Sequence, residues 1–165
     1  MQATSISDEQ VVEVAQTVVG TMLSLTAESC VGLPADLGSF QVAGMIHITG
    51  GWNGTVLLLC NELFAQRAAS IMLDIPAEEA TMADTHDAVA ELVNIIGGSI
   101  KSIVQGPSSL SLPTVTQGSD FCLHVHWTEQ VAAGSLVCDG EPIQVRVLEG
   151  TGDLKPVSTC ASGSA

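Results

Sequence analysis

The first third of the chain changes from a helical period to a strand-like alternation. Ser7 followed by Gln10 is typical of a capping box, and the apolar positions after it recur every three or four residues, which predicts a helix over residues 8–26. From Ser39 onwards apolar and polar residues alternate, and the segment GGWNG separates this run from TVLLLC. The two runs are therefore expected to form an antiparallel hairpin.

Two more helices are expected in the middle of the chain. Asn61 is suited to cap the first of them, and Pro76 is expected to end it. Its expected buried stripe consists of Phe64, Ala68, Ile71 and Ile75. The second helix is long, covers residues 84–104 and is expected to bury Val89, Leu92, Val93, Ile96, Ile100 and Ile103.

Strand patterns dominate the C-terminal half. The segments LSLPTVTQG, FCLHVHW and SLVCDGEPIQVRVLE favour strands, and Asp139-Gly140 is typical of a tight turn within the last one. This order predicts the α+β class, with an antiparallel or mixed sheet packed against one long surface helix and two further helices. Residues 1–150 are expected to form one domain, and residues 151–165, which show no period, a flexible tail.

Composition and charge exclude several classes of partner. With 165 residues, 46% of them hydrophobic, the chain is long and apolar enough to bury a core. Its 18 acidic and 4 basic residues give a net charge of -14, and so few cations make nucleic acids and anionic membranes poor partners. No apolar run is long enough to predict a membrane span. A protein or a neutral ligand remains as a partner.

The five cysteines are widely spaced and include no CxxC pair. This pattern favours reduced thiols over a disulfide framework. The first 20 residues also lack the basic start and apolar run of a secretory signal. The expected compartment is therefore the cytoplasm.

The long helix carries a polar stripe opposite its apolar face. At steps of three and four residues this stripe contains Asp84, Asp87, Glu91, Asn94, Gly98 and Lys101. Gly97 and Gly98 each cost a helix interior about 1 kcal/mol relative to Ala. Because Gly98 lies one turn beyond Asn94, its missing side chain would let another molecule come close to the Asn94 carboxamide. We therefore expect a docking surface at this stripe.

A carboxamide and a carboxylate one turn apart suit phosphoryl transfer. The carboxamide of Asn94 can donate and accept hydrogen bonds at once, so it can hold a water in line for attack on a phosphoryl group. The carboxylate of Glu91 can pair with a cation of an incoming partner. Because the chain has little positive charge, the rest of the active site is expected to come with that partner. The same spacing is also compatible with an ordinary solvated helix face.

The segment DAVAELVNIIGGSIKS, followed by LSLPTVTQG, resembles the signature of the CheX members of the CheC/CheX/FliY family of chemotaxis phosphatases. These proteins carry an acidic or Ser residue and then E-x-x-N on a long surface helix, with an S-L-P-T-V type of segment after it. The order of hairpin, second helix and strand-rich C-terminal half is similar as well. The resemblance therefore covers residues 5–149.

The resemblance implies that Glu91 reaches the active-site lysine of a phosphorylated CheY-like response regulator. It implies that Asn94 orients the water that attacks the aspartyl phosphate, which makes the chain a phosphatase of that regulator. The Mg²⁺ would belong to the regulator, so that this chain holds no cofactor or metal of its own. Asp87 takes the leading acidic position and, with Gly98 and Lys101, is a candidate for partner binding. Members of the CheX type pair through their sheets, which implies a homodimer.

The first helix repeats part of this spacing with Glu9, Glu13 and Gln16. Glutamine is one methylene longer than asparagine and would misplace a bound water by about the length of a C–C bond. We therefore expect no second active site there. An alternative function for the whole chain is a non-catalytic docking module of the same fold that binds a receiver or a flagellar switch protein.

A second alternative is a ligand or metal site at Cys122, His124 and His126. In a strand these residues share one side, and their side chains are competent zinc or iron ligands. Residues two apart in a strand are about 7 Å from one another, so three of them rarely converge on one ion. An ordinary polar sheet face or a dimer contact is the favoured interpretation.

Overall fold

Seven strands of the protein form one antiparallel sheet. The computed structural model describes residues 5–32, 40–151 and 157–160. The strand order is β1-β7-β8-β3-β2-β4, and β5 follows β4 along the same edge of β2. The strands are β1 (Ala27–Ser29), β2 (Val42–Gly50), β3 (Gly54–Cys60), β4 (Ser108–Leu110), β5 (Thr114–Gln117), β7 (Thr128–Cys138) and β8 (Glu141–Gly150).

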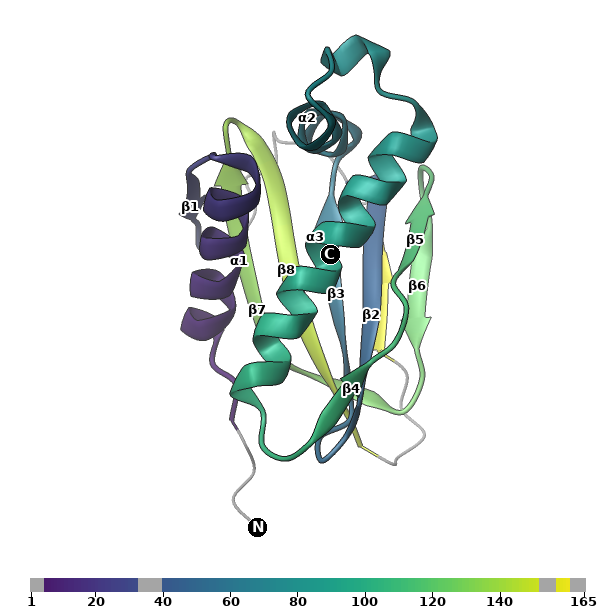
Figure 1. Cartoon of the computed structure of the whole chain (residues 1–165). Helices are drawn as coiled ribbons and strands as arrows, with labels where there is room; N and C mark the ends of the chain where they lie inside the picture. Colours follow the sequence, from purple (N-terminus) through teal and green to yellow (C-terminus); the bar gives the residue numbers. More distant parts are fainter. Residues whose placement is uncertain (1–4, 33–39, 152–156, 161–165) are drawn as a thin grey trace.

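Helices cover one face of this sheet, which confirms the predicted α+β class. They are α1 (Asp8–Leu23), α2 (Glu62–Leu73) and α3 (Met82–Ile103), with a short 3₁₀ turn, η2 (Ala77–Glu79), before α3. Helix α1 lies over β7 and α3 lies over β2, with the two helices in contact along the same face (Figure 1). None of the described helices is long and apolar enough to cross a membrane.

Two glycines in the sheet allow both helices to approach closely. A Cβ added at Gly44 of β2 would lie 3.0 Å from Cγ1 of Val89 on α3. A Cβ added at Gly134 of β7 would lie 2.9 Å from Cγ2 of Val12 on α1. The two helices are thus seated on the sheet in the same way, each over one glycine.

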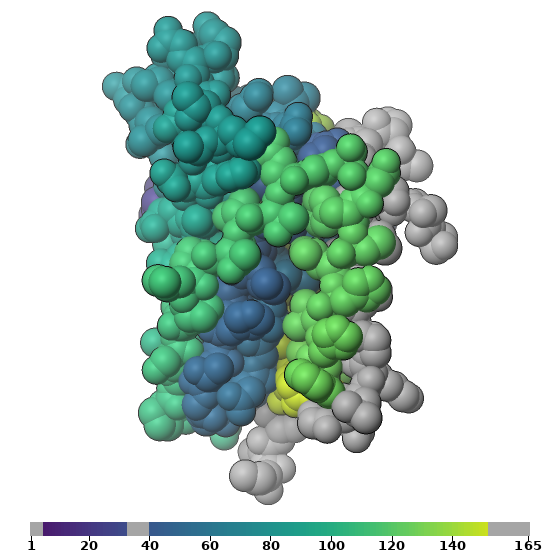
Figure 2. Space-filling view, turned by 90° about the vertical axis from the view of Figure 1, so that its right-hand side faces the viewer, coloured from purple at the N-terminus to yellow at the C-terminus, as the bar shows by residue number. Residues whose placement is uncertain are grey.

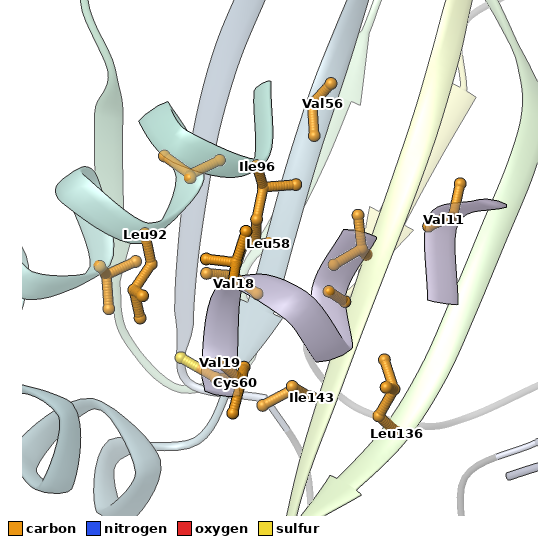
Figure 3. Close-up of a cluster of buried hydrophobic side chains, with 14 of the residues drawn as sticks. Val11, Val18, Val19, Val56, Leu58, Cys60, Leu92, Ile96, Leu136 and Ile143 are labelled. Carbon is orange, nitrogen blue, oxygen red and sulfur yellow. The ribbon is translucent and has the colours of Figure 1, made fainter. Parts of the chain in front are cut away.

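The main core lies between the helices and the sheet (Figure 3). Val18 of α1, Ile96 of α3 and Leu58 of β3 belong to this buried cluster. Burial raises the pKa of the Cys60 thiol, which is in the same cluster, to about 12. That thiol therefore stays protonated near neutral pH and packs as a small apolar side chain.

The first two helices are shorter than the sequence predicted. Helix α1 ends at Leu23 because Ser24 takes a left-handed conformation and its N–H bonds to the Gly20 carbonyl. Helix α2 begins after Asn61, whose side chain accepts the Phe64 N–H as expected, and it ends at Leu73. Its buried residues are Phe64, Ala65, Ala68 and Ala69, so the prediction that Ile71 is buried is wrong.

Edge strands were the elements that sequence patterns missed. The segment after α1 contains β1, which pairs with β7, and residues 33–39 lie outside the described residues. The expected strand LSLPTVTQG is interrupted, and it forms β4 and β5 on either side of residues 111–113. The tight turn at Asp139-Gly140 is confirmed, because both residues have positive φ and connect β7 to β8.

A two-stranded ribbon packs on the sheet face opposite the helices. It consists of β6 (Cys122–Val125) and β9 (Val157–Cys160), and Phe121 and Leu123 pack against Ala43 and Leu59 of the sheet. Strand β9 lies in the segment 151–165, which was expected to be a flexible tail. The rest of that segment, 152–156 and 161–165, lies outside the described residues.

One cysteine of the ribbon contradicts the prediction of reduced thiols. Cys122 is disulfide-bonded, and Cys160 lies opposite it in the β6–β9 register. Cys30, Cys60 and Cys138 are free. Local patterns gave no sign of this bond, because strand pairing brings together segments that are far apart in the sequence.

Candidate functional site

A capping box fixes the N-terminal end of α3. Oγ1 of Thr81 accepts a hydrogen bond from the backbone N–H of Asp84 at 3.2 Å, and Oδ2 of Asp84 accepts one from the backbone N–H of Thr81 at 2.8 Å. The hydrogen bond from the Thr81 backbone makes the largest contribution to lowering the pKa of the Asp84 carboxyl. A hydrogen bond with the Thr81 side chain lowers this pKa further. The helix thus begins at a defined residue.

The apolar face of α3 is buried as predicted, and this orients the polar stripe. Val89, Leu92, Val93, Ile96 and Ile100 are buried against the sheet and α1, and Ile103 packs at the edge of the core. Residues half a turn away from this face point outwards. The orientation of the stripe is therefore set by the core and does not depend on a partner.

The structure brings the predicted site residues together on this outward stripe. Asp87 and Glu91 are exposed, while Asn94, Gly98 and Lys101 are partly exposed. With a rise of about 1.5 Å per residue, Glu91 and Asn94 are separated by about 4.5 Å along the helix axis. In the part of the chain that the structure describes, no hydrogen bond or ion pair engages either of these two side chains. Both groups are free to meet another molecule.

The two adjacent glycines of α3 have different roles. A Cβ at Gly97 would lie 2.6 Å from Cγ2 of Ile46, which is fully buried on β2, so packing requires a glycine there. A Cβ at Gly98 would meet only Cδ1 of Leu110, at an ordinary 3.9 Å. Internal packing therefore explains Gly97 but not Gly98, which leaves an open surface one turn beyond Asn94.

The carboxamide of Gln16 on α1 already has a hydrogen-bond partner within the protein. Nε2 of Gln16 donates a hydrogen bond to the backbone carbonyl of Ala27 at 3.0 Å and so fastens β1 to α1. Glu9 and Glu13 remain exposed on the same helix. The side chain that would have to orient a water in a second site is thus already committed to the fold.

A polar link beside the stripe was missed by the sequence analysis. Nε2 of His86 lies 2.7 Å from Oε1 of Gln117, whose Nε2 donates to Oε1 of Glu62 at 2.9 Å. Because Gln117 donates to the carboxylate, its oxygen faces His86, and the nearby ring nitrogen of His86 must carry the proton. The link joins α2, α3 and β5, and its members are too far apart in sequence for a local motif to reveal it.

The stripe carries more negative than positive charge. It contains Asp87 and Glu91 but only one cation, Lys101. Arg67 is paired with Asp139 away from α3, and Arg146 lies on β8, where burial lowers the pKa of its guanidinium. The described part of this chain therefore does not assemble the positive charge that is needed to stabilise a phosphoryl group during its transfer.

The alternative site at Cys122, His124 and His126 is not built for a metal in this structure. All three residues are exposed, but only Cys122 and His124 lie on β6, and His126 belongs to the turn that follows it, so the predicted strand is shorter than expected. Cys122 is disulfide-bonded, so its sulfur is not available as a thiolate ligand. Within the described ranges, no group of three or more His, Cys, Asp or Glu side chains is arranged to hold a metal ion.

Three solved structures of chemotaxis proteins share this fold. A CheX from Desulfovibrio desulfuricans is 21% identical, with a TM-score of 0.68 over 86% of this chain and 97% of that one. A CheX from Vibrio vulnificus is 17% identical, with a TM-score of 0.72 over 90% and 100% of the two chains. The chain from a CheX-CheY-BeF₃-Mg²⁺ complex of Borrelia burgdorferi is 19% identical, with a TM-score of 0.61 over 86% and 96%. These likenesses concern the fold.

The sequence itself carries the family assignment. No curated protein sequence matches the chain. The family model described as chemotaxis phosphatase CheX, however, matches residues 42–134, which is more than half of the chain and includes all of α3. The chain therefore belongs to the CheX family of chemotaxis phosphatases.

Proposed function

We propose that this protein hydrolyses the aspartyl phosphate of a CheY-like response regulator by inserting Glu91 and Asn94 into the regulator's active site. The observation that carries the proposal is the uncommitted carboxamide of Asn94, presented on the outward stripe of a capped and well-packed helix. The family of the chain supports the type of activity. The CheX–CheY complex of Borrelia burgdorferi, which shares the fold, supports the choice of partner.

In this mechanism Asn94 positions the nucleophile. Its carbonyl oxygen accepts a hydrogen bond from a water, and the lone pair of that water then points at the phosphorus atom. Attack forms a bond between the water oxygen and phosphorus and breaks the bond between phosphorus and the aspartyl oxygen. The products are inorganic phosphate and the free aspartate. The rate increases because the positioned water has lost its translational and rotational entropy before the reaction begins.

Glu91 fixes the register of the two proteins. Its exposed carboxylate pairs with the lysine of the receiver active site, one turn away from the water held by Asn94. Asp87 extends the same acidic edge by another turn, and Lys101 provides the opposite charge at the far end of the stripe. The receiver contributes the Mg²⁺ and the positive charge that stabilise the transferring phosphoryl group.

The direct test measures phosphate release from phosphorylated receivers with the wild type and with Asn94→Ala. The variant should lose roughly 100-fold or more of the single-turnover rate, because the water is no longer held in line. It should still bind a receiver loaded with beryllium fluoride and Mg²⁺ with nearly the wild-type Kd. An unchanged rate in the variant would rule out the role proposed for Asn94.

The same measurements separate catalysis from docking. A docking module binds the loaded receiver but does not accelerate phosphate release even as the wild type. Glu91→Ala should weaken binding of the loaded receiver in either case, since it removes an ionic contact that both functions use. Turnover by the wild type therefore decides between the two functions.

The homodimer that the family resemblance implies stays a prediction. The helix-free sheet face, through which such a dimer would pair, carries the β6–β9 ribbon over Ala43 and Leu59. A dimer that pairs through this face would therefore have to form beside this ribbon. Sedimentation of the full chain tests this prediction, and a mass of one chain would contradict it.

A further inference from the structure

The segment between β4 and β5 is held rigidly at the edge of the sheet. Ser111 donates its backbone N–H to the carbonyl of His47 at 2.9 Å, and its Oγ accepts the His47 N–H at 3.0 Å. The same hydroxyl donates to the carbonyl of Leu112 at 2.9 Å. These three hydrogen bonds fix the conformation of a segment that has paired strands on both sides.

This segment leaves an apolar side chain in solvent that a regular strand would bury. A continuous strand over residues 108–117 would place Leu110 and Leu112 on the same face. Leu110 does pack against the core, but the interruption at Ser111 turns Leu112 outwards and leaves it 89% exposed. A single exposed leucine is ordinary on a protein surface. A leucine that is held outside the core by a fixed turn is less easily explained by folding alone.

The exposed leucine lies beside the stripe of α3. At one end of the segment Gln117 contacts His86, and at the other end Leu110 lies next to Gly97 and Gly98. The chain between these two contacts therefore runs alongside the part of α3 that carries Glu91 and Asn94. In Figure 2 the green segment that follows α3 lies on the surface next to the teal helix.

The acidic charge of this chain favours an apolar contact with a partner at Leu112. The chain carries a net charge of -14, and its stripe is acidic apart from Lys101. Long-range attraction therefore favours only a basic partner surface, whereas the gain from burying an apolar side chain does not depend on the partner's charge. Because the backbone of this segment is already held by hydrogen bonds, its ordering on docking costs little entropy.

We propose that Leu112 is an apolar anchor for the receiver, buried on docking by an apolar patch next to the receiver's phosphorylation site. This inference rests on the proposed function, and it adds an apolar contact to the ionic and amide contacts of the stripe. The Leu112 side chain does not touch the reacting atoms. It contributes to affinity and to the choice among receivers, so that receivers with a polar residue at this patch bind more weakly.

The test compares Leu112→Ser, Leu112→Met and Val131→Ser. Binding of a receiver loaded with beryllium fluoride and Mg²⁺ gives Kd, and single-turnover phosphate release gives the chemical rate. Leu112→Ser should raise Kd roughly 10- to 100-fold and leave the rate at saturating protein unchanged. Leu112→Met should keep most of the affinity. Val131 is an exposed residue on β7, three strands away from β2, and its substitution should change neither quantity.

The outcomes separate this inference from the proposed function. If the wild type binds the loaded receiver and Leu112→Ser binds it equally well, the anchor is refuted while the role of Asn94 stands. If the wild type neither binds nor dephosphorylates any receiver, both proposals fail. If Leu112→Ser changes the sedimentation mass instead of Kd, the leucine is covered by a second copy of this chain, and the receiver anchor is again refuted.

Discussion

Helices α1 and α3 are built alike, but only one of them has a free carboxamide. Each begins with a capping box, lies over a glycine of the sheet and carries a glutamate followed three residues later by a carboxamide. Gln16 of α1 donates to the Ala27 carbonyl, whereas the Asn94 side chain of α3 engages no partner among the described residues. The comparison shows that a motif is informative only when its functional group is not already used by the fold.

The glycines that follow these carboxamides should differ most in their effect on receiver binding. Gly20 and Gly98 each lie four residues after the carboxamide, and a Cβ at either position meets nothing closer than 3.9 Å. Gly20→Ala and Gly98→Ala should therefore each raise the free energy of unfolding by up to about 1 kcal/mol. Only Gly98→Ala should weaken receiver binding, by about tenfold or more, because its methyl group enters the docking surface.

Gly97→Ala is the control for this pair in a denaturation experiment. Its Cβ would collide with Ile46, so the variant should lose about 1–2 kcal/mol of stability in spite of its better helix propensity. If Gly98→Ala bound the receiver as tightly as the wild type, Gly98 would have no part in docking.

The two carboxamides should also differ in their effect on stability. Gln16→Ala removes the hydrogen bond to Ala27 and should lower the free energy of unfolding by about 1 kcal/mol. Asn94→Ala removes no internal hydrogen bond seen in the described residues and should change stability by less than about 0.5 kcal/mol. Urea denaturation of both variants measures this difference. A large loss in Asn94→Ala would mean that Asn94 is a structural residue.

The smallest expected difference between α1 and α3 is the pH dependence of their capping boxes. The box of α1 uses Gln10, which does not titrate, while that of α3 uses Asp84, whose pKa is lowered from 3.8 by hydrogen bonds with Thr81. The Asp84 cap therefore stabilises α3 fully above pH 3.8 and loses its effect as the pH falls through the lower folded pKa. On acidification, hydrogen-exchange protection in the first turn should fall more in α3 than in α1. Asp84→Asn should remove this additional loss of protection in α3.

Local periodicity predicted the helices, the hairpin and the outward stripe, because these depend on neighbouring residues. It placed Glu91 and Asn94 opposite the face that contains Val89 and Ile96, and the structure has them there. It could not predict the pairing of β1 with β7 or the ribbon of β6 and β9, because these short strands are defined by partners far away in the sequence.

The details of the site that the sequence missed also depend on distant partners. The contact of His86 with Gln117 spans 31 residues, and the link between Ser111 and His47 spans 64. The turn that exposes Leu112 follows from the second of these contacts, since alternation alone would have buried that side chain. The difference between Gly97 and Gly98 likewise became visible only when Ile46 and Leu110 were placed beside them.

One paired measurement tests the central claim most directly. Single-turnover phosphate release from one phosphorylated receiver is followed with the wild type, Gln16→Ala and Asn94→Ala at saturating concentrations of each. We predict a wild-type rate for Gln16→Ala and a rate lower by two orders of magnitude or more for Asn94→Ala. Equal rates for the two variants would contradict the assignment of the chemistry to α3.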